Sequence, residues 1–558
     1  MSRDRLLLRI GWLTILALVA LAYMNGLHAP FVYDDKIEVV GNATIRDLSQ
    51  LEAVLEYNVS RVLLILTYAW NFRSFGLEPF GYHVTSLVIH GLALAVGLAF
   101  LARLGRLGGH DRPVWAALFA GGLWAVHPMT TEGVTYITGR SESLCALFVL
   151  ATMAVWAKAL LLERDAPGSG RWPRLLAVVL CFLAMGTKEV AVMTPFALLA
   201  METFFGQRSR DDGRRIAWKW YLPFFGAIAL GVAGRALYAE HFIPREVDRP
   251  LFTQLSTQAE VWLRYLLLWV WPTNQTLYHH IPEVELFSAR AAVVWTGLGL
   301  VFAAGWRCTR ELPLVRFALI CAALFLIPSS SVVALKESMA EHRAYATGLY
   351  LLAAIVWAVP TRHARRMVGV AALLLPVLIM LTMARNRVWS TEVGLWREAT
   401  DLKPEVAEAW YGLGDAHRFA GDFEQAIVAF ETALEQDPEH LDSWNNLGIS
   451  RANMGDAHGA KQAWREALAV QRSYCKAHAN LGFLAHTRGE IEEAVVEFTT
   501  TLSYCPTNLV SHYGLGMIYA DQRRNPERAV GHFETLLELA PDFSRAEEVR
   551  NRLLELTW

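Results

Sequence analysis

Hydrophobic positions are distributed unevenly along the chain. Long runs of Leu, Ala, Val, Ile and Phe recur between Leu6 and Met383, whereas residues from Trp389 to Trp558 mix apolar and charged positions amphipathically. The first pattern predicts membrane-spanning helices, and the second predicts amphipathic helices in water. The sequence therefore predicts an all-α protein with two domains, a helical membrane domain at 1–389 and a soluble helical domain at 390–558.

Twelve stretches are candidates for crossing a membrane. About 20 apolar residues span the hydrocarbon layer as a helix, and fewer suffice where neighbouring helices shield the segment. The run that follows MSRDR is long enough to cross and has no small-residue cleavage site after it, so we expect a first span and not a signal peptide. The stretches are 6–26, 82–104, 113–127, 142–162, 173–187, 190–206, 216–237, 257–273, 291–306, 315–329, 343–360 and 364–386.

Basic loops fix the expected direction of these spans, because Lys and Arg in short loops mark the cytoplasmic side. If all twelve stretches cross, the clusters Arg307–Arg316 and Arg362–Arg366 fall outside. If 257–273 instead dips in and returns, or lies at the interface, every basic cluster falls inside. That stretch also carries Glu260 and Arg264, which a lipid-facing helix would avoid. We therefore predict eleven spans, with the N-terminus in the cytoplasm and the C-terminal domain outside.

This topology places the polar clusters of the membrane domain on its outer face. They lie in the first outer loop, at 28–81, and in the short connections between later spans. The clusters are Asp34–Asp35, His127–Glu132, Arg140–Glu142, Lys188–Glu189, His279–His280 and Lys336–Arg343.

A period of 34 residues organises the C-terminal domain. Trp410, Trp444, His478 and His512 are each 34 apart, and Gly414, Gly448, Gly482 and Gly516 share the spacing. Gly421, Gly455 and Gly489 also follow it, and small residues at such positions let paired helices approach closely. This is the tetratricopeptide (TPR) pattern, and it predicts four full repeats from about Val406 to Asp542 with terminal helices at both ends. Such arrays present a concave surface suited to extended polypeptide.

Charge and cysteine content exclude some classes of function. The formal net charge of −2 gives no basis for nucleic-acid binding. The six cysteines form no CxxC pair, which leaves a metal or redox motif unsupported. Whether Cys475 and Cys505 pair is left open by the sequence.

Two adjacent carboxylates, Asp34 and Asp35, follow the first span within the segment APFVYDDKIEVVGN. Adjacent carboxylates at a membrane surface repel each other unless a cation or hydrogen bonds compensate. Such a pair suits a general base that takes a proton from an acceptor hydroxyl. An Asx-type turn at a helix end is the structural alternative.

Further candidates cluster in WAVHPMTTEGVTYITGRSE. His127, Glu132, Arg140 and Glu142 lie between the third and fourth spans, where charged groups are costly unless they face a cavity or each other. An Arg at this position can hold a phosphate through bidentate hydrogen bonds. Alternatively, Arg140 and Glu142 form a structural pair. The same reasoning, with helix-end snorkelling as the alternative, adds Lys188, Glu189, Glu341 and Arg343.

The order of these motifs resembles a known family. FVYDD, LTYAWNFRSFGLEPFGYHVTSLVIH, WAVHPMTTEGVTYITGRSE, KE and AEHRAY, followed by TPRs, are similar to the transmembrane and TPR-repeat-containing O-mannosyltransferases and their bacterial relatives. The resemblance covers essentially the whole chain. It implies a GT-C glycosyltransferase in a bacterial inner membrane that uses a polyprenyl-phosphate sugar on the outer face.

The resemblance also implies site residues. An acidic pair in the first outer loop is catalytic in related enzymes, which points to Asp34 as the base and Asp35 as its acidic neighbour. Arg140, Lys188 and Arg343 are our candidates for the donor phosphate. The chain departs from the family at Thr130, where a second His is usual, and at Arg61–Val62, where Arg-Pro is usual. No metal is required, because Arg and Lys can stabilise a phosphate leaving group.

The predicted function is transfer of a sugar, mannose by resemblance, from a polyprenyl-phosphate donor to Ser or Thr of an exported polypeptide. The TPR array would bind that acceptor or a partner protein. The alternatives are a transferase directed at a glycan or lipid, and a non-catalytic membrane scaffold or transporter whose buried charges are structural.

Overall fold

The computed structural model describes residues 3–47, 51–206, 208–209, 213–214, 218–237, 249–330, 335, 337–522, 525–541 and 543–557. These residues form two compact units, Met1–Leu395 and Trp396–Trp558. All of the predicted site residues are among the described residues. Lys336, which belongs to the last polar cluster, is not.

The first unit is a bundle of helices, and each of the twelve predicted stretches overlaps one of them. The all-α prediction is confirmed apart from a two-stranded hairpin, β1 (Arg208–Ser209) with β2 (Gly213–Arg214). The helices are α1 (Arg3–Tyr23), α4 (Pro79–Leu107), α5 (Pro113–Ala125), α7 (Arg140–Asp165), α8 (Arg171–Met185), α9 (Thr194–Phe205), α10 (Leu222–Leu237), α12 (Leu251–Val270), α13 (Ala289–Cys308), α14 (Pro313–Leu326), α15 (Tyr345–Ala358) and α16 (Ala364–Val388).

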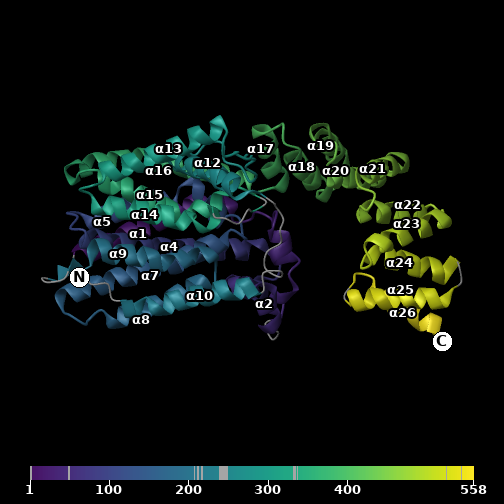
Figure 1. The fold of residues 1–558 in the computed structure, drawn as a ribbon, viewed down its shortest axis with the longest axis horizontal. Helices are drawn as coiled ribbons and strands as arrows, with labels where there is room; N and C mark the ends of the chain where they lie inside the picture. The colour runs from purple at the N-terminus through teal and green to yellow at the C-terminus, as the bar shows by residue number, and fades with distance from the viewer. Residues whose placement is uncertain are drawn as a thin grey trace. The chain divides into compact units, whose positions relative to one another are not determined.

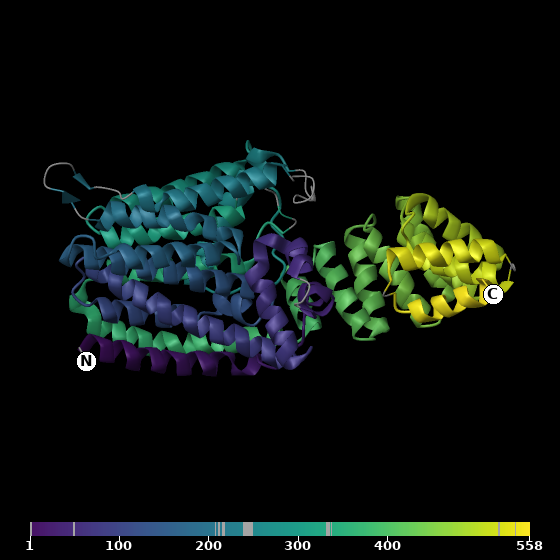
Figure 2. The same cartoon turned by 90° about the horizontal axis from the view of Figure 1, so that it is seen from below.

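These helices run side by side along the length of the unit (Figures 1 and 2). α4 packs against α5 and α7, α7 against α8, and α14 against α15, around a continuous apolar core. Within the described residues, five helices are both long and apolar enough to cross a membrane unaided: α1, α4, α7, α13 and α16. The others are shorter or more polar, so any crossing by them would need their neighbours for shielding.

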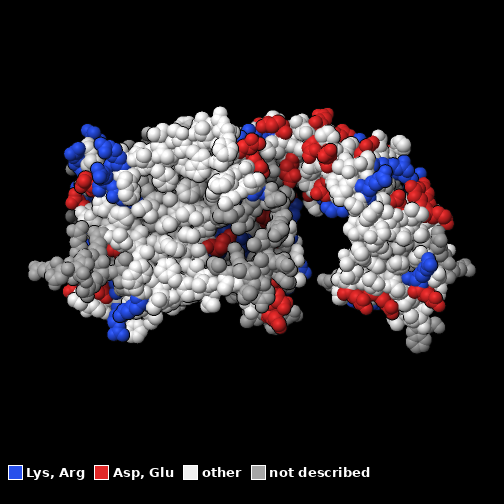
Figure 3. All heavy atoms as spheres, viewed as in Figure 1, with Lys and Arg blue, Asp and Glu red and all other residues white. Residues whose placement is uncertain are grey.

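Short loops rich in Lys and Arg lie together at one end of the bundle. Arg164 donates from its Nη2 to the carbonyl oxygens of Leu107 and Phe205, so the ends of α4, α7 and α9 meet there, and Thr361 donates to Asp111 in the connection after α4. Figure 3 shows Lys and Arg concentrated at this end, where Figure 1 marks the N-terminus. The predicted polar clusters lie at the opposite end, which we call the polar end.

The middle of α12 contacts the segment 338–340 and the start of α13. Gln258 donates to the carbonyl of Ser338, and the Tyr265 hydroxyl donates to the carbonyl of Ala340. Glu260 accepts from Arg264 and from Arg290, which lies at the start of α13. Whether α12 crosses the membrane, and with it the count of eleven spans, stays a prediction. The sidedness of the membrane stays a prediction.

The predicted first outer loop is itself folded. α2 (Leu51–Asn58) lies across the polar end in Figure 1, and α3 (Val62–Phe75) follows it. Val39, Ile45, Val54, Leu64 and Tyr68 are buried together beneath this segment. A small hydrophobic core of this kind holds the loop that carries Asp34 and Asp35 as a defined structure.

The second unit is a series of helix pairs. They are α18 (Ala407–Phe419) with α19 (Phe423–Gln436), α20 (Leu441–Asn453) with α21 (Ala457–Val470), α22 (Cys475–Thr487) with α23 (Ile491–Tyr504), and α24 (Leu509–Met517) with α25 (Pro526–Leu539). α17 (Glu392–Leu402), which begins in the first unit, precedes these pairs, and α26 (Ala546–Thr557) follows them. The predicted four repeats with terminal helices are confirmed.

Two sets of glycines have different roles in these repeats. A Cβ on Gly414, Gly448, Gly482 or Gly516 would come closer than 3.0 Å to an aromatic side chain of the partner helix, so these residues do permit close helix packing. The prediction that Gly421, Gly455 and Gly489 do the same is wrong. Their φ angles are 79°, 82° and 76° with open space around the Cβ position, because they turn the chain between the paired helices.

Gly448→Val is expected to destabilise the second repeat. The new side chain would collide with the buried indole of Trp464, and overpacking of this kind costs about 1–3 kcal/mol. Thermal unfolding of the purified chain, followed by circular dichroism, should show a lower transition for this repeat. Gly531→Ala is the matched control, since Gly531 lies in α25 with open space at its Cβ position. Equal stability of the two variants would contradict the packing role.

The question of the cysteine pair is answered by the structure. Cys475, at the start of α22, and Cys505, at the end of α23, form a disulfide with their Cα atoms 6.3 Å apart. It closes the open end of the third helix pair.

Candidate active site

Asp34 and Asp35 lie on a tight turn after the first helix. Tyr33 precedes them with a positive φ of 51°, a conformation that is uncommon for a residue with a side chain. The Tyr33 hydroxyl donates to the carboxylate of Glu337, which fixes the turn. The two aspartates therefore point into different surroundings although they are adjacent in sequence.

Asp35 is buried and fully held by its neighbours. Its Oδ1 accepts from the backbone N–H and the hydroxyl of Thr138, at 2.8 and 2.6 Å, and its Oδ2 accepts from the N–H of Val32 at 3.3 Å. Burial raises the pKa of Asp35 to about 7 against the lowering effect of these bonds. This environment suits a residue that ties the turn to the segment before α7.

Asp34 is the more open of the two. It is partly exposed, and its Oδ2 accepts from the Tyr136 hydroxyl at 2.8 Å. Partial burial raises the pKa of its carboxyl, while the Tyr136 hydrogen bond and the charge of Arg61 act in the opposite direction. A carboxylate that is partly desolvated and still accessible is suited to accepting a proton.

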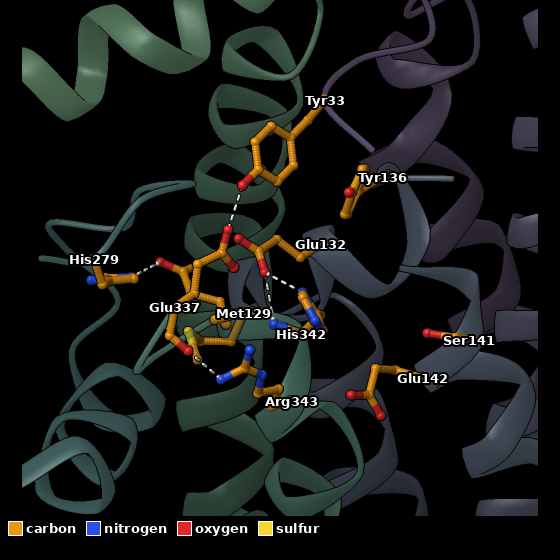
Figure 4. Close-up of polar contacts among 12 residues, drawn as sticks. Tyr33, Met129, Glu132, Tyr136, Ser141, Glu142, His279, Glu337, His342 and Arg343 are labelled. Carbon is orange, nitrogen blue, oxygen red and sulfur yellow. Dashed lines mark hydrogen bonds and ion pairs between the residues drawn. The ribbon is translucent and has the colours of Figure 1, made fainter. Parts of the chain in front are cut away.

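Two buried carboxylates, Glu132 and Glu341, have contrasting environments, and Figure 4 shows Glu132 beside His342. Glu132, on the short helix α6 (Thr131–Val134), accepts from the backbone N–H and the Nδ1 of His342 at 2.8 and 3.0 Å. Glu341 accepts from Gln275 at 2.6 Å and pairs with His279 at 2.9 Å. Both carboxylates are almost wholly buried.

The surroundings of Glu132 and Glu341 shift the pKa values of these two carboxyls in opposite directions. Burial, together with the nearby Glu341 charge, raises the pKa of Glu132 to about 8. The pKa of Glu341 is lowered, because the hydrogen bond from His279 and the charge of Arg385 outweigh its burial. Burial also lowers the pKa of His342 to about 3. These surroundings favour the protonated form of Glu132, the ionised form of Glu341 and the neutral form of His342.

Two of the predicted cations reach this end of the bundle. Arg343 lies beside Glu337 and donates from Nη1 to its carbonyl oxygen at 2.9 Å (Figure 4). Lys188 pairs with Glu142 at 2.8 Å and donates to Ser141 at 3.3 Å. Arg343 keeps part of its surface exposed, whereas the charge of Lys188 is balanced within the protein.

Arg140 is not arranged as a phosphate ligand. Its side chain is fully buried and lies over the rings of Tyr68 and Tyr82. The guanidinium donates to Ser86, Thr67, Asn71 and the carbonyl of Tyr82, at 2.7–3.1 Å. The alternative of an Arg140–Glu142 pair is also wrong, because Glu142 pairs with Lys188. Arg140 instead joins α3 and α4 to α7.

The remaining predicted residues divide between the site and its edge. His127 caps the turn Pro128–Thr130 by accepting from the N–H of Met129, and its ring lies 4.5 Å from that of Trp269. Glu189 lies more exposed, with Arg61 at 3.9 Å. Within the part of the chain that the structure describes, no group of three or more His, Cys, Asp or Glu side chains is placed to hold a metal ion.

Three residues of the site were not singled out from the sequence. Tyr136 contacts Asp34, and at the end of α16 the charge of Arg385 acts on Glu341 and Trp389 stacks on Tyr136. Glu337, which accepts from Tyr33, lies within the predicted cluster Lys336–Arg343. The cluster ARNRVW directly after the last apolar run was the available signal, because polar residues there are placed at the same end as Asp34.

Lys188→Ala is expected to destabilise the first unit by about 3–5 kcal/mol, because it leaves the charge of Glu142 buried without a partner. Thermal unfolding of the purified chain in detergent measures the loss. Adding Glu142→Gln to the same chain removes the orphaned charge and should recover part of the stability. No recovery in the double variant would show that the two side chains are not coupled.

Three TPR family models match the second unit, at residues 407–440, 429–462 and 511–547. The TPR prediction is confirmed.

Curated relatives match along most of the chain. The chain is similar to protein O-mannosyl-transferases. One from Caenorhabditis elegans is 23% identical over 424 residues, which cover 72% of this chain and 59% of that protein. TMTC3 of Mus musculus is 25% identical over 474 residues, covering 75% and 50%, and TMTC4 of Mus musculus is 24% identical, covering 71% and 62%. The resemblance stated from the motifs is confirmed, and the chain spans between half and about three fifths of the length of these relatives.

Solved structures resemble the repeat region. MamA is 20% identical, with 27% of this chain and 89% of that chain covered and a TM-score of 0.25. A TPR protein of Thermus thermophilus is 18% identical, with 32% and 94% covered and a TM-score of 0.26.

Proposed function

We propose that the first unit is a GT-C glycosyltransferase. It transfers a sugar, mannose by analogy with the named relatives, from a polyprenyl-phosphate donor to Ser or Thr of an exported polypeptide. The single observation that supports this most is the state of Asp34: a partly exposed carboxylate, held in one orientation by Tyr136, at the polar end of a membrane-type bundle.

Asp34 acts as the general base in this proposal. The Oγ of the acceptor Ser or Thr attacks C1 of the sugar, and its proton passes to the Asp34 carboxylate. The bond between C1 and the phosphate oxygen breaks, and polyprenyl phosphate leaves with the electron pair. Asp35 takes no part in proton transfer and holds the turn through Thr138 and Val32.

The donor phosphate is assigned to Arg343. The structure records one hydrogen bond from its guanidinium, to the Glu337 carbonyl, and the planar fork can present its other N–H groups to phosphate oxygens. Lys188 is not assigned to the phosphate, because its charge is balanced by Glu142. The lipid chain of the donor would lie in the bilayer beside the bundle, so only its phosphosugar needs to enter the polar end.

The second unit binds the acceptor polypeptide or a partner protein on the outer side of the membrane. Its concave helical repeats suit an extended chain. The Cys475–Cys505 disulfide supports the outer placement, because disulfides persist in oxidising compartments.

Mass spectrometry of exported proteins from cells with and without this chain tests the proposal. Hexose on Ser or Thr should be found only when the chain is present. Hexose that appears instead on a lipid or a glycan would favour the alternative acceptors, and an unchanged profile of all three would contradict a transferase.

A further inference from the structure

The end of α16 is packed directly against the segment that holds the candidate base. Trp389, fully buried after the last turn of α16, stacks on Tyr136 with ring centroids 5.0 Å apart and an interplanar angle of 29°. The Tyr136 hydroxyl in turn donates to Asp34 at 2.8 Å. An unbroken series of contacts therefore runs from α16 to the Asp34 carboxylate.

A second contact from α16 fixes the same segment. Asn386, one turn before Trp389, accepts from the Thr135 hydroxyl at 2.8 Å. Its amide nitrogen donates to the carbonyl of Ala22 and to Asn25, at 2.9 and 3.0 Å. Asn386 is hydrogen-bonded to Thr135, the residue before Tyr136, and Trp389 stacks on the ring of Tyr136. The phenol therefore has little freedom to move away from Asp34.

An ion pair secures the other side of the turn. Lys36, two residues after Asp34, pairs with Glu392 at the beginning of α17. The residues from Asn386 to Glu392 thus reach Asp34 through Tyr136 and contact Lys36 directly, although 356 residues separate Lys36 from Glu392 in sequence.

We propose that Tyr136 and Trp389 are positioning residues for Asp34: Trp389 holds the phenol ring in place, and the Tyr136 hydroxyl fixes the orientation of the Asp34 carboxylate. The inference rests on the proposed function only in naming Asp34 as the base. Neither residue needs to touch the donor or the acceptor.

The electrostatic consequence has a definite sign. An O–H that donates to a carboxylate stabilises the ionised form, so the Tyr136 bond lowers the pKa of Asp34 against the raising effect of burial. Removing the hydroxyl should raise that pKa and move the ionisation of Asp34 to higher pH. The other charged or titratable groups that face or flank Asp34 are Arg61, Asp35, Lys36, Glu38, Glu337 and Tyr33.

The experiment follows the protonation of Asp34 without donor or acceptor. The purified full chain in detergent is titrated in D₂O, and the infrared band of protonated carboxyl groups is assigned to Asp34 by its loss in Asp34→Asn. Tyr136→Phe should move the midpoint of this band upward by about one pH unit. Trp389→Ala should move it in the same direction, and Trp389→Phe, which keeps an aromatic ring, should restore most of the wild-type midpoint.

Tyr57→Phe is the matched control. Tyr57 also donates to a carboxylate of the same loop, Glu38 at 3.3 Å, but it has no contact with Asp34 among the described hydrogen bonds. Its loss should leave the Asp34 midpoint unchanged. An unchanged midpoint in Tyr136→Phe, or an equal shift in Tyr57→Phe, overturns the proposal.

Thermal unfolding of each variant shows whether it is folded. If Trp389→Ala does not fold, the midpoints of Tyr136→Phe and Trp389→Phe alone test the proposal. The midpoint is independent of whether the chain transfers sugar, so a failure of the proposed function does not obscure the result. Where transfer is measurable, loss of the positioning contact should lower kcat about tenfold and move the acid limb of the pH profile upward, with KM little changed.

Discussion

Asp34→Asn should abolish sugar transfer while leaving the protein folded. The substitution keeps the size of the side chain and removes the carboxylate that would take the acceptor proton, and loss of a general base typically costs about 10²–10⁴-fold in rate. Asp34 is partly exposed and accepts from Tyr136, a bond that the Asn oxygen can still accept. Transfer of labelled sugar from polyprenyl-phosphate mannose to a Ser/Thr-rich peptide measures the effect in purified chain.

Asp35→Asn is the control that separates the two carboxylates. Asn can still accept from Thr138 through its oxygen, but its NH₂ would face the N–H of Val32, so this variant should lose about 1–3 kcal/mol of stability. Its remaining folded protein should retain transfer. If Asp34→Asn transfers sugar normally, or if Asp35→Asn alone is inactive while fully folded, the assignment of the base is wrong.

The second large effect is expected at Arg140 and concerns folding. Arg140→Ala removes a wholly buried side chain and leaves the polar groups of Ser86, Asn71 and Tyr82 without their donor. Each buried polar group left unpaired costs about 1–3 kcal/mol, so the summed loss for the three groups is about 3–9 kcal/mol. The variant should be recovered in much lower yield in a monodisperse form, as measured by size-exclusion chromatography in detergent.

Arg343→Ala is the matched comparison for Arg140. Arg343 is partly exposed and its recorded hydrogen bond is to a single carbonyl, so its loss should leave the yield unchanged and raise the KM for the lipid donor. A well-folded Arg140→Ala chain with weakened donor binding would reverse the roles that the structure assigns to these two cations.

Hydropathy and periodicity were enough to predict most of the fold. Twelve apolar stretches became twelve helices, and the spacing of Gly414, Gly448, Gly482 and Gly516 located the paired helices of the repeats. Both signals are local, since helix formation and close packing at a repeated small residue depend on residues less than 34 positions apart. The role of Gly421 was misassigned because sequence spacing does not distinguish a turn glycine from a packing glycine.

The site was only partly predictable from the sequence. The adjacent carboxylates of Asp34 and Asp35 marked its position, but nothing in the order of residues indicated that Thr138 would bury one and Tyr136 would hold the other. Arg140 was chosen for the donor phosphate because a cation near hydrocarbon needs an anion. Neutral oxygens from α3 and α4 satisfy it instead.

The sequence by itself determined that this protein has a helical membrane unit and a TPR unit, because hydrophobic runs and a 34-residue period are properties of neighbouring positions. Only the tertiary structure decided which polar groups are accessible. Burial, and with it the contrast between Asp34 and Asp35 or between Glu132 and Glu341, depends on side chains brought together from segments more than a hundred residues apart. The same is true of Trp389, whose proximity to Tyr136 follows from the packing of α16 and not from any local pattern.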